Sequence, residues 1–520
     1  MRTLIASGLD LLTLVLGALA LTLALPNELF PEGLGFLGWI ALFPVFHFTR
    51  RHRWLGCLVG ALVFGFTLFL VSTFWLTSFH PLAFPIVILI VLPQFVAVFL
   101  VSGLLWRWIP RAWWSQAALW ALFEWGRTLG PWAFPYGALS TTQAFFPLAI
   151  QSVDLFGTTG LTFLMAVPAA LMASWLGALV TVGELVLAAL LLAANFTYGW
   201  WMLSRPEEGA KVTVALVQNV RDPWVGGVQA YGEALNVLID LSRRGLTQSP
   251  DLVVWPETAF VPAIEWHTRY RTDPASWQLV KTLETFLKTT KVAFVIGNDH
   301  GVLAPDGVTR VDYNAVRVWD QGWTGTYLKT KLVPFTEGFP WRDQLPQVAK
   351  FLEDNGSHFW EAGKAVTVIK AGGIVLGTPI CYEDAFSEVS RTMVLQGARL
   401  LVNLTNDSWS LGTASKNQHL AAAVFRTLET RTPLVRAGND GRTVAVDSRG
   451  QIIASLPIGV REVLVHSVVL SSGSPPLYAL WGDWEIILLV LLLILQVFSS
   501  FEAVRRPKPE PNAIDKGDNL

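Results

Sequence analysis

The stretch GIVLGTPICYED, residues 373–384, leads from an apolar run directly to a cysteine and two acidic residues. Its opening residues are mostly β-branched or apolar, which is typical of a buried strand. The run ends in Cys381, one of only two cysteines in 520 residues, and acidic residues follow within three positions. Side chains that act on a ligand commonly lie at the ends of such strands. We therefore predict that Cys381 reacts.

Two strand-like runs upstream also end in a chemical group. Residues 251–255 lead to Glu257, and residues 325–328 lead to Lys329. A carboxylate can accept the proton of a thiol and an ammonium can stabilise the thiolate, so the three groups together make an activated nucleophile. Taken singly, each has a simpler reading as a core cysteine, a helix-capping acid or a solvated lysine. Lys331 competes with Lys329 for the same role.

Around these residues, strand-like runs alternate with helical ones. The predicted strands cover residues 211–218, 252–255, 291–296, 315–319, 325–328, 374–380, 400–403, 434–437, 443–446 and 452–454. The predicted helices cover residues 230–244, 276–289, 388–396 and 417–430. This order indicates an α/β layered domain over residues 206–476.

The rest of the chain has the composition of a membrane protein. Apolar residues make up 52% of the sequence, and they are concentrated in the first two hundred positions and one C-terminal stretch. A helix needs roughly 20 apolar residues to cross a bilayer. About eight spans are predicted, over residues 4–25, 34–49, 54–75, 82–106, 113–129, 156–176, 182–203 and 478–501. We therefore expect a multi-pass helical bundle over residues 1–205, a C-terminal membrane helix over 477–503 and a polar cytoplasmic tail over 504–520.

The second and fifth spans are the shortest, and the fifth carries Glu124 and Arg127. Charges at membrane depth are costly and usually serve a function. These two either pair with each other inside the bundle or contact a lipid headgroup.

Positive charge predicts the orientation. The flanking basic residues that fall on one side of the predicted bundle are Arg2, Arg50, Arg51, Arg53, Arg107, Arg111, Arg505, Arg506 and Lys508. If that side is the cytoplasm, both termini are cytoplasmic and the α/β domain lies outside, in the periplasm of a bacterium with two membranes.

Charge and residue types exclude several classes of partner. A net charge of −1 with no basic stripe argues against nucleic acid. The eight histidines show no ligand spacing, so we expect neither a metal nor another cofactor. Cys57 lies within a predicted span, so we expect no disulfide with Cys381.

Three motifs resemble the signatures of the nitrilase, or carbon–nitrogen hydrolase, superfamily. They are WPE at residues 255–257, YLKTKLVPFTE at 327–337 and ICYE at 380–383. With its predicted membrane helices, the chain is similar over nearly its whole length to the apolipoprotein N-acyltransferases, bacterial inner-membrane enzymes that add the third acyl chain to lipoproteins. NLTNDSW at 403–409, EWGR at 124–127 and FPYG at 134–137 add local matches.

The resemblance implies a fold and a reaction. The fold is an αββα sandwich. Cys381 takes an acyl chain from a phospholipid as a thioester, and the α-amine of a diacylated apolipoprotein then removes it. Glu257 is the general base, and Lys329 and the backbone N–H of Tyr382 stabilise the oxyanion. The family also implies a monomer without a cofactor.

The resemblance also suggests residues around that centre. Glu337 is expected to orient Lys329, and Glu383 is the other supporting carboxylate. Trp409, Trp341, Phe339 and Phe335 either line an acyl groove or are interfacial anchors. Trp224 is a further substrate-binding candidate, although it follows Asp222-Pro223 where the family has a Lys-Trp pair.

Two other functions fit the same motifs. The first is a membrane-tethered amidase, in which water resolves the thioester. The second is a scaffold that binds lipoproteins without reacting. About eight spans argue against the amidase, and the complete set of Glu257, Lys329 and Cys381 argues against the scaffold.

Overall fold

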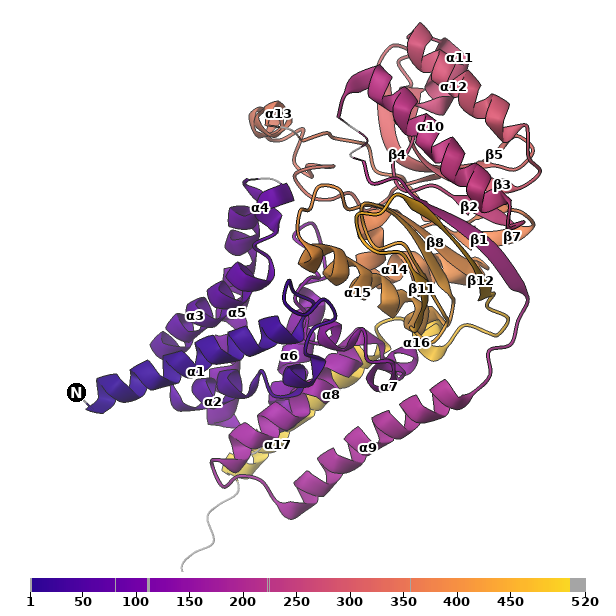
Figure 1. Ribbon diagram of the computed structural model, residues 1–520. Helices are drawn as coiled ribbons and strands as arrows, with labels where there is room; N and C mark the ends of the chain where they lie inside the picture. Colours follow the sequence, from indigo (N-terminus) through magenta and orange to yellow (C-terminus); the bar gives the residue numbers. More distant parts are fainter. Residues whose placement is uncertain are drawn as a thin grey trace, which may run out of the picture.

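The computed structural model describes residues 2–79, 81–109, 113–221, 223, 225–355 and 357–505, and it has a helical half and a sheet-containing half (Figure 1). The helical half contains α1 (Arg2–Ala24), η1 (Gly35–Trp39), α2 (Phe43–Arg51), α3 (Trp54–Ser72), α4 (Leu76–Phe79), α5 (Ala83–Trp108), α6 (Trp113–Gly126), η2 (Ser140–Gln143), α7 (Pro147–Ile150), α8 (Val153–Trp175) and α9 (Val182–Ser204). After the sheets the chain returns through α16 (Leu477–Trp481) and α17 (Trp484–Arg505), and α17 packs against α6 and α8.

The sheet-containing half is built on two six-stranded sheets. The first has the order β12-β1-β2-β3-β4-β5 and the second the order β11-β10-β9-β8-β7-β6. The strands are β1 (Lys211–Gln218), β2 (Leu252–Val254), β3 (Ala293–Leu303), β4 (Arg310–Trp319), β5 (Trp323–Leu328), β6 (Ile369–Ala371), β7 (Ile374–Gly377), β8 (Leu400–Asn406), β9 (Leu434–Asn439), β10 (Val444–Val446), β11 (Ile452–Ser455) and β12 (Glu462–Val469). The helices are α10 (Gly227–Leu246), α11 (Ile264–Tyr270), α12 (Pro274–Leu287), α13 (Pro346–Asp354), η3 (Cys381–Ala385), α14 (Ser387–Leu395) and α15 (Thr413–Thr430).

The alternation of side chains along β1 explains the layers. Val214 and Leu216 face the second sheet and share a core with Val435, whereas Ala215 and Val217 face α10 and α12. On the far side, α14 contacts β7 and α15 contacts β9. The result is a four-layered αββα sandwich, which confirms the predicted fold class.

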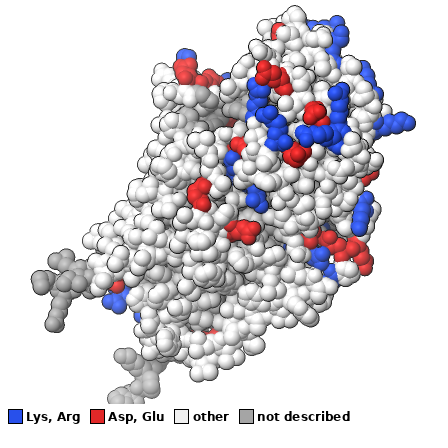
Figure 2. All heavy atoms as spheres, in the orientation of Figure 1, with Lys and Arg blue, Asp and Glu red and all other residues white. Residues whose placement is uncertain are grey.

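The helical half presents an apolar surface. Within the described residues, α3, α5, α8 and α9 are long and apolar enough to cross a membrane, and residues 8–24 and 484–498 form shorter apolar helices. Figure 2 shows charged side chains gathered on the sheet-containing half and scarce over the helical half on the visible face. On α9, Val182, Leu190 and Trp200 are all more than half exposed. A row of exposed apolar side chains of this kind suits contact with lipid.

The structure differs from the predicted span over residues 34–49. That stretch forms the 3-10 turn η1 and then α2, which has only nine residues and begins with Pro44 in its first turn. A nine-residue helix is about 14 Å long, too short to cross a bilayer. Gly35 and Gly38 lie so close to Thr142 that a Cβ atom on either would come within 2.5 Å of it. The segment therefore packs against η2.

Two other predicted spans are shorter in the structure. The span predicted over residues 113–129 corresponds to α6, which has 14 residues and ends at Gly126. The C-terminal span begins six residues later than predicted, because Gly482 takes a positive φ of 67° and separates α16 from α17. Tyr478 lies in the α16 turn and packs against Gly157, where a Cβ atom would lie 2.3 Å from its ring.

Candidate active site

The three predicted reactive residues follow strands of both sheets. Glu257 lies three residues after β2, and Lys329 directly follows β5, both in the first sheet. Cys381 comes four residues after β7 of the second sheet. Between them, Ile380 forms an isolated parallel β-bridge with Leu404 of β8. The two sheets face each other, so these strand ends meet at one edge of the sandwich.

Lys329 is fully buried between two carboxylates. Its Nζ atom donates to Glu257 Oε1 at 3.0 Å and to Glu337 Oε1 at 2.8 Å. Burial alone lowers the pKa of a lysine, but Glu257 and Glu337 raise the pKa of Lys329 well above its usual value. The ammonium is therefore permanently charged and fixed in place.

The carboxylate of Glu257 is oriented from both sides. Asn314 Nδ2 donates to Oε1 at 2.7 Å, and the backbone N–H of Asn406 donates to Oε2 at 2.9 Å. Asn314 was not predicted from the sequence, because it lies in β4, outside the three motifs. Asn406 lies within the 403–409 match, which carried no specific role.

Cys381 is 7% exposed and takes a positive φ of 47° at the start of η3. A positive φ is uncommon for a residue with a side chain and is associated with functional sites. Burial raises the pKa of its thiol, Glu257 raises it further, and Lys329 only partly opposes them. The resting group is therefore a thiol, and its proton must leave as the sulfur attacks.

The backbone N–H of Tyr382 lies in the first turn of η3, where N–H groups have no partner within the helix.

Glu337 connects Lys329 to the loop that follows it. One carboxylate oxygen binds Lys329 Nζ, and the other accepts the backbone N–H of Val333 at 2.9 Å. Burial raises the pKa of Glu337 above its usual value, and the nearby Lys329 only partly opposes this shift. Glu337 therefore makes direct contact with the lysine that it is predicted to orient.

Glu383 joins two of the strand ends. Its Oε1 atom accepts from Tyr327 Oη at 2.8 Å, from both N–H and hydroxyl of Thr330 at 2.7 Å, and from Lys331 N at 3.2 Å. Its Oε2 atom accepts from Ile380 N at 2.8 Å. Glu383 therefore fixes the segment after Lys329 to the residue before Cys381.

Beside the thiol lies a cavity of about 470 Å³ that both halves of the protein enclose. Glu257, Glu337 and Cys381 form its polar end, and Ile86 and Ile90 of α5 are part of its apolar wall. The same cavity therefore offers both the reactive thiol and an apolar surface for an acyl chain.

The predicted aromatic residues lie in different places. Phe335 and Trp409 line this cavity, and Trp409 packs on Trp75 with ring centroids 5.6 Å apart. Phe339 is buried against Ala349 and Leu352. Trp341 packs on Trp132 at 4.7 Å. Trp224 lies outside the described residues.

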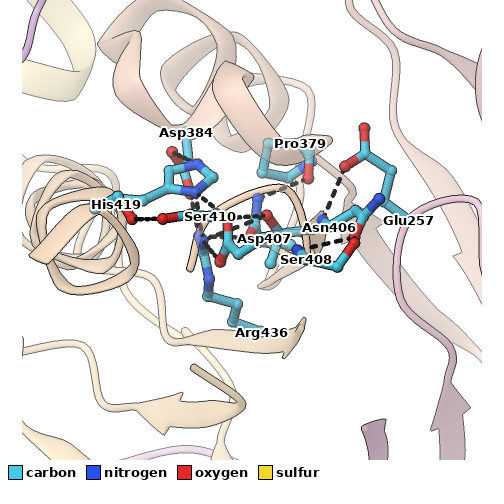
Figure 3. A network of polar contacts seen from close by, with 12 residues as sticks. Glu257, Pro379, Asp384, Asn406, Asp407, Ser408, Ser410, His419 and Arg436 are labelled. Carbon is cyan, nitrogen blue, oxygen red and sulfur yellow. Dashed lines mark hydrogen bonds and ion pairs between the residues drawn. The ribbon is translucent and has the colours of Figure 1, made fainter. Parts of the chain in front are cut away.

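A buried charged network, hereafter the Arg436 cluster, adjoins the site (Figure 3). Arg436 pairs with Asp384 and, at 3.3 Å, with Asp407, and His419 lies between the same two carboxylates at 3.1 and 2.8 Å. Burial and Arg436 lower the pKa of His419, but the two aspartates raise it to about 9. Burial raises the pKa of Asp407, but His419 and Arg436 lower it to about 2. The cluster thus contains two cations and two anions.

This cluster connects the elements that carry the reactive groups. Asp384 belongs to η3, three residues after Cys381, and Asp407 follows Asn406, whose N–H holds Glu257. The cluster was not predicted from the sequence, since its members come from four separate segments of the chain.

Glu124 and Arg127 hold one loop through hydrogen bonds to its backbone. Arg127 donates to the carbonyls of Phe134 and Tyr136 at 3.2 and 2.7 Å, and Glu124 accepts from Leu139 N at 2.9 Å. This loop carries Phe134 and Tyr136 into the cavity wall. Their charges therefore serve a protein contact in this structure.

Comparison with known proteins agrees with this geometry. Residues 213–474 match the family described as carbon-nitrogen hydrolase, and residues 17–171 match the apolipoprotein N-acyltransferase N-terminal domain. The chain is 35% identical to apolipoprotein N-acyltransferase 1 of Treponema denticola, over 94% of this chain and 96% of that protein. This chain belongs to the apolipoprotein N-acyltransferase family. Family members from Treponema pallidum and Geobacter metallireducens are 36% and 32% identical, each over 91% of this chain and 92% of theirs.

Proposed function

We propose that this family member moves an acyl chain from a membrane phospholipid to the α-amine of a diacylated apolipoprotein, with Cys381 as the carrier. One observation supports this most strongly. Glu257, Glu337 and Cys381 line a single cavity together with apolar residues of α5, Ile86, Val87 and Ile90. An enzyme that acts on soluble amides needs no such wall.

In the first half reaction the sulfur of Cys381 attacks the ester carbonyl of the phospholipid. Glu257 accepts the thiol proton, and the carbonyl oxygen becomes an oxyanion near Lys329 and the Tyr382 N–H. The tetrahedral intermediate then collapses, the carbon–oxygen bond to glycerol breaks, and Glu257 returns the proton to the departing alkoxide. The products are an acyl-thioester and a lysophospholipid.

In the second half reaction the α-amine of the acceptor attacks the thioester. Glu257 takes a proton from the amine, the carbon–sulfur bond breaks, and the proton passes to the sulfur of Cys381. The products are the amide and the free thiol. Each step returns Glu257 to its carboxylate form, so one base serves both halves.

We further propose that the cavity lies at the periplasmic surface of the inner membrane, that both termini are cytoplasmic and that the chain acts as a monomer. The family's N-acylation of lipoproteins and the basic residues that flank the predicted spans support this location. Acyl chains can then remain in the bilayer. Moving them through water would cost about 0.8 kcal/mol per CH₂ group.

The test uses purified protein, a defined phospholipid and a synthetic diacylated lipopeptide. We expect triacylated peptide and lysophospholipid in equal amounts from the wild type and from Cys57→Ala, which changes the only other cysteine. Cys381→Ala and Glu257→Gln should form neither product. Free fatty acid with unchanged lipopeptide would instead indicate a hydrolase, and lipopeptide binding without turnover would indicate a scaffold.

A further inference from the structure

A second cavity of about 510 Å³ lies next to the first and is not used by the chemistry described above. It is bounded by the loops around residues 330–343 and 359–362. The residues that line both cavities are Pro131, Ala133, Pro334, Trp360 and Tyr382. Because Tyr382 directly follows Cys381, the second cavity begins one residue from the nucleophile.

The two cavities differ in chemistry. The first has the apolar wall of α5, whereas the second is bordered by Lys331, Arg342, Asp343 and Glu361. Two of these residues are basic and two are acidic, so the border carries no excess charge. Lys331 already pairs with Glu388 at 2.8 Å, and Arg342 pairs with Glu353 at 3.3 Å. A phosphate group would be expected to select a border with surplus positive charge.

The walls of the second cavity are rich in rings. Pro334, Pro340, Phe359 and Phe386 contribute to them, and the Arg342 guanidinium lies 5.7 Å from the centre of the Phe359 ring. Grooves lined by aromatic rings bind extended peptides, whose backbone is already close to the bound conformation.

The acceptor substrate has a branch that matches this arrangement. The α-carbon of its first residue carries the attacking amine, the diacylglyceryl thioether and the rest of the polypeptide. When the amine reaches the thioester at Cys381, the lipid chains would be expected to lie on the apolar side of the site, toward α5 and the bilayer. The polypeptide must leave in another direction.

We infer that the second cavity binds the first residues of the acceptor polypeptide after the lipidated cysteine. This inference rests on the proposed function, since it names where one substrate of that reaction lies. Tyr382 separates the two branches: lipid on the α5 side, and peptide on the side of Phe359 and Arg342.

The test compares two acceptors and separates the half reactions. One acceptor is a diacylglyceryl-cysteine amide with no further residues, and the other carries a peptide tail. The variants are Phe359→Ala, which removes a wall, and Ala362→Phe, which adds bulk at an exposed lining position. Tyr270→Ala is the matched control, because Tyr270 is also half-buried and stacked by an arginine, Arg269, at 5.8 Å.

For the tailed acceptor we expect KM to rise about tenfold in both variants, the change that follows from losing one well-packed contact. The KM of the amide without a tail and the rate of thioester formation from phospholipid should match those of Tyr270→Ala. Equal losses for both acceptors, or slower thioester formation, would overturn the inference and point to the lipid headgroup or to a structural role. Absence of any thioester in the wild type would instead refute the proposed function.

Discussion

Removing Arg436 should destabilise the sheet-containing half strongly. Arg436 is fully buried, and in Arg436→Gln the carboxylates of Asp384 and Asp407 would keep only His419 as a cation. Breaking a buried ion pair by removing one partner costs about 3–5 kcal/mol. For a unit of this size that corresponds to a fall in Tm of about 6–20 °C. Adding Asp384→Asn removes the uncompensated charge, so the double variant should recover about 1–3 kcal/mol.

The two cysteines provide the assay. Both thiols are buried, Cys57 in α3 and Cys381 in the site. In a Cys57→Ala background a thiol-reactive dye can label Cys381 through the cavity in the folded protein, so unfolding is measured as the increase in labelling rate over that folded-state rate. Arg244→Gln is the control, because Arg244 is half exposed and pairs with Asp240 and Glu462 at the surface. It should change stability by less than about 1 kcal/mol.

Two results would refute this reasoning. The first is that Arg436→Gln lowers the free energy of unfolding no more than Arg244→Gln does. The second is that the double variant with Asp384→Asn is no more stable than Arg436→Gln alone. The first would mean that the positive charge of Arg436 is not needed to stabilise the buried carboxylates. The second would mean that Arg436 acts through packing.

Three further predictions follow from the contacts of single residues. Glu337→Gln must place an amide NH₂ group against either Lys329 or the Val333 N–H, so it loses one charged hydrogen bond. We expect thioester formation to slow about 10- to 100-fold. Intact mass recorded against time measures this rate. Glu383→Gln cannot accept all five hydrogen bonds that the carboxylate accepts. The free energy of unfolding should therefore fall by about 1–3 kcal/mol in the dye assay. Because the folded pKa of His419 is raised to about 9, its stabilising effect is complete below about pH 6.5 and is lost as pH rises through 9. The stability difference between wild type and His419→Asn should therefore shrink by up to about 3 kcal/mol over that range, and a pH-independent difference would contradict the assigned charge.

The sequence predicted that Glu257, Lys329 and Cys381 follow strands, because each comes after a run with a clear local pattern. The predicted strand at residues 211–218 coincides with β1, and the runs before Glu257 and Lys329 form β2 and β5. Strand β12 was missed, although it pairs with β1 along its whole length. Its Val-Leu-Val run at residues 463–465 is apolar and mostly β-branched, a strand signal that could have been recognised.

Tertiary contacts explain what the sequence could not predict. Residues 34–49 are apolar enough for a span, but close packing of Gly38 on Thr142 holds them as a turn and a short helix. Asn314 and Arg436 look like ordinary polar strand residues in the sequence. Their roles appear only when β4 and β9 bring them to Glu257 and to Asp384.

The central claim is that an acyl group is held on one sulfur atom between donor and acceptor. The most direct measurement is the intact mass of the protein after mixing with phospholipid alone and then with diacylated lipopeptide. We predict a gain of one acyl chain that maps to Cys381, is released by hydroxylamine and transfers to the peptide when the acceptor is added. Triacylated peptide formed without any acyl group on Cys381, or an acyl group that water removes while the peptide stays diacylated, would contradict the account.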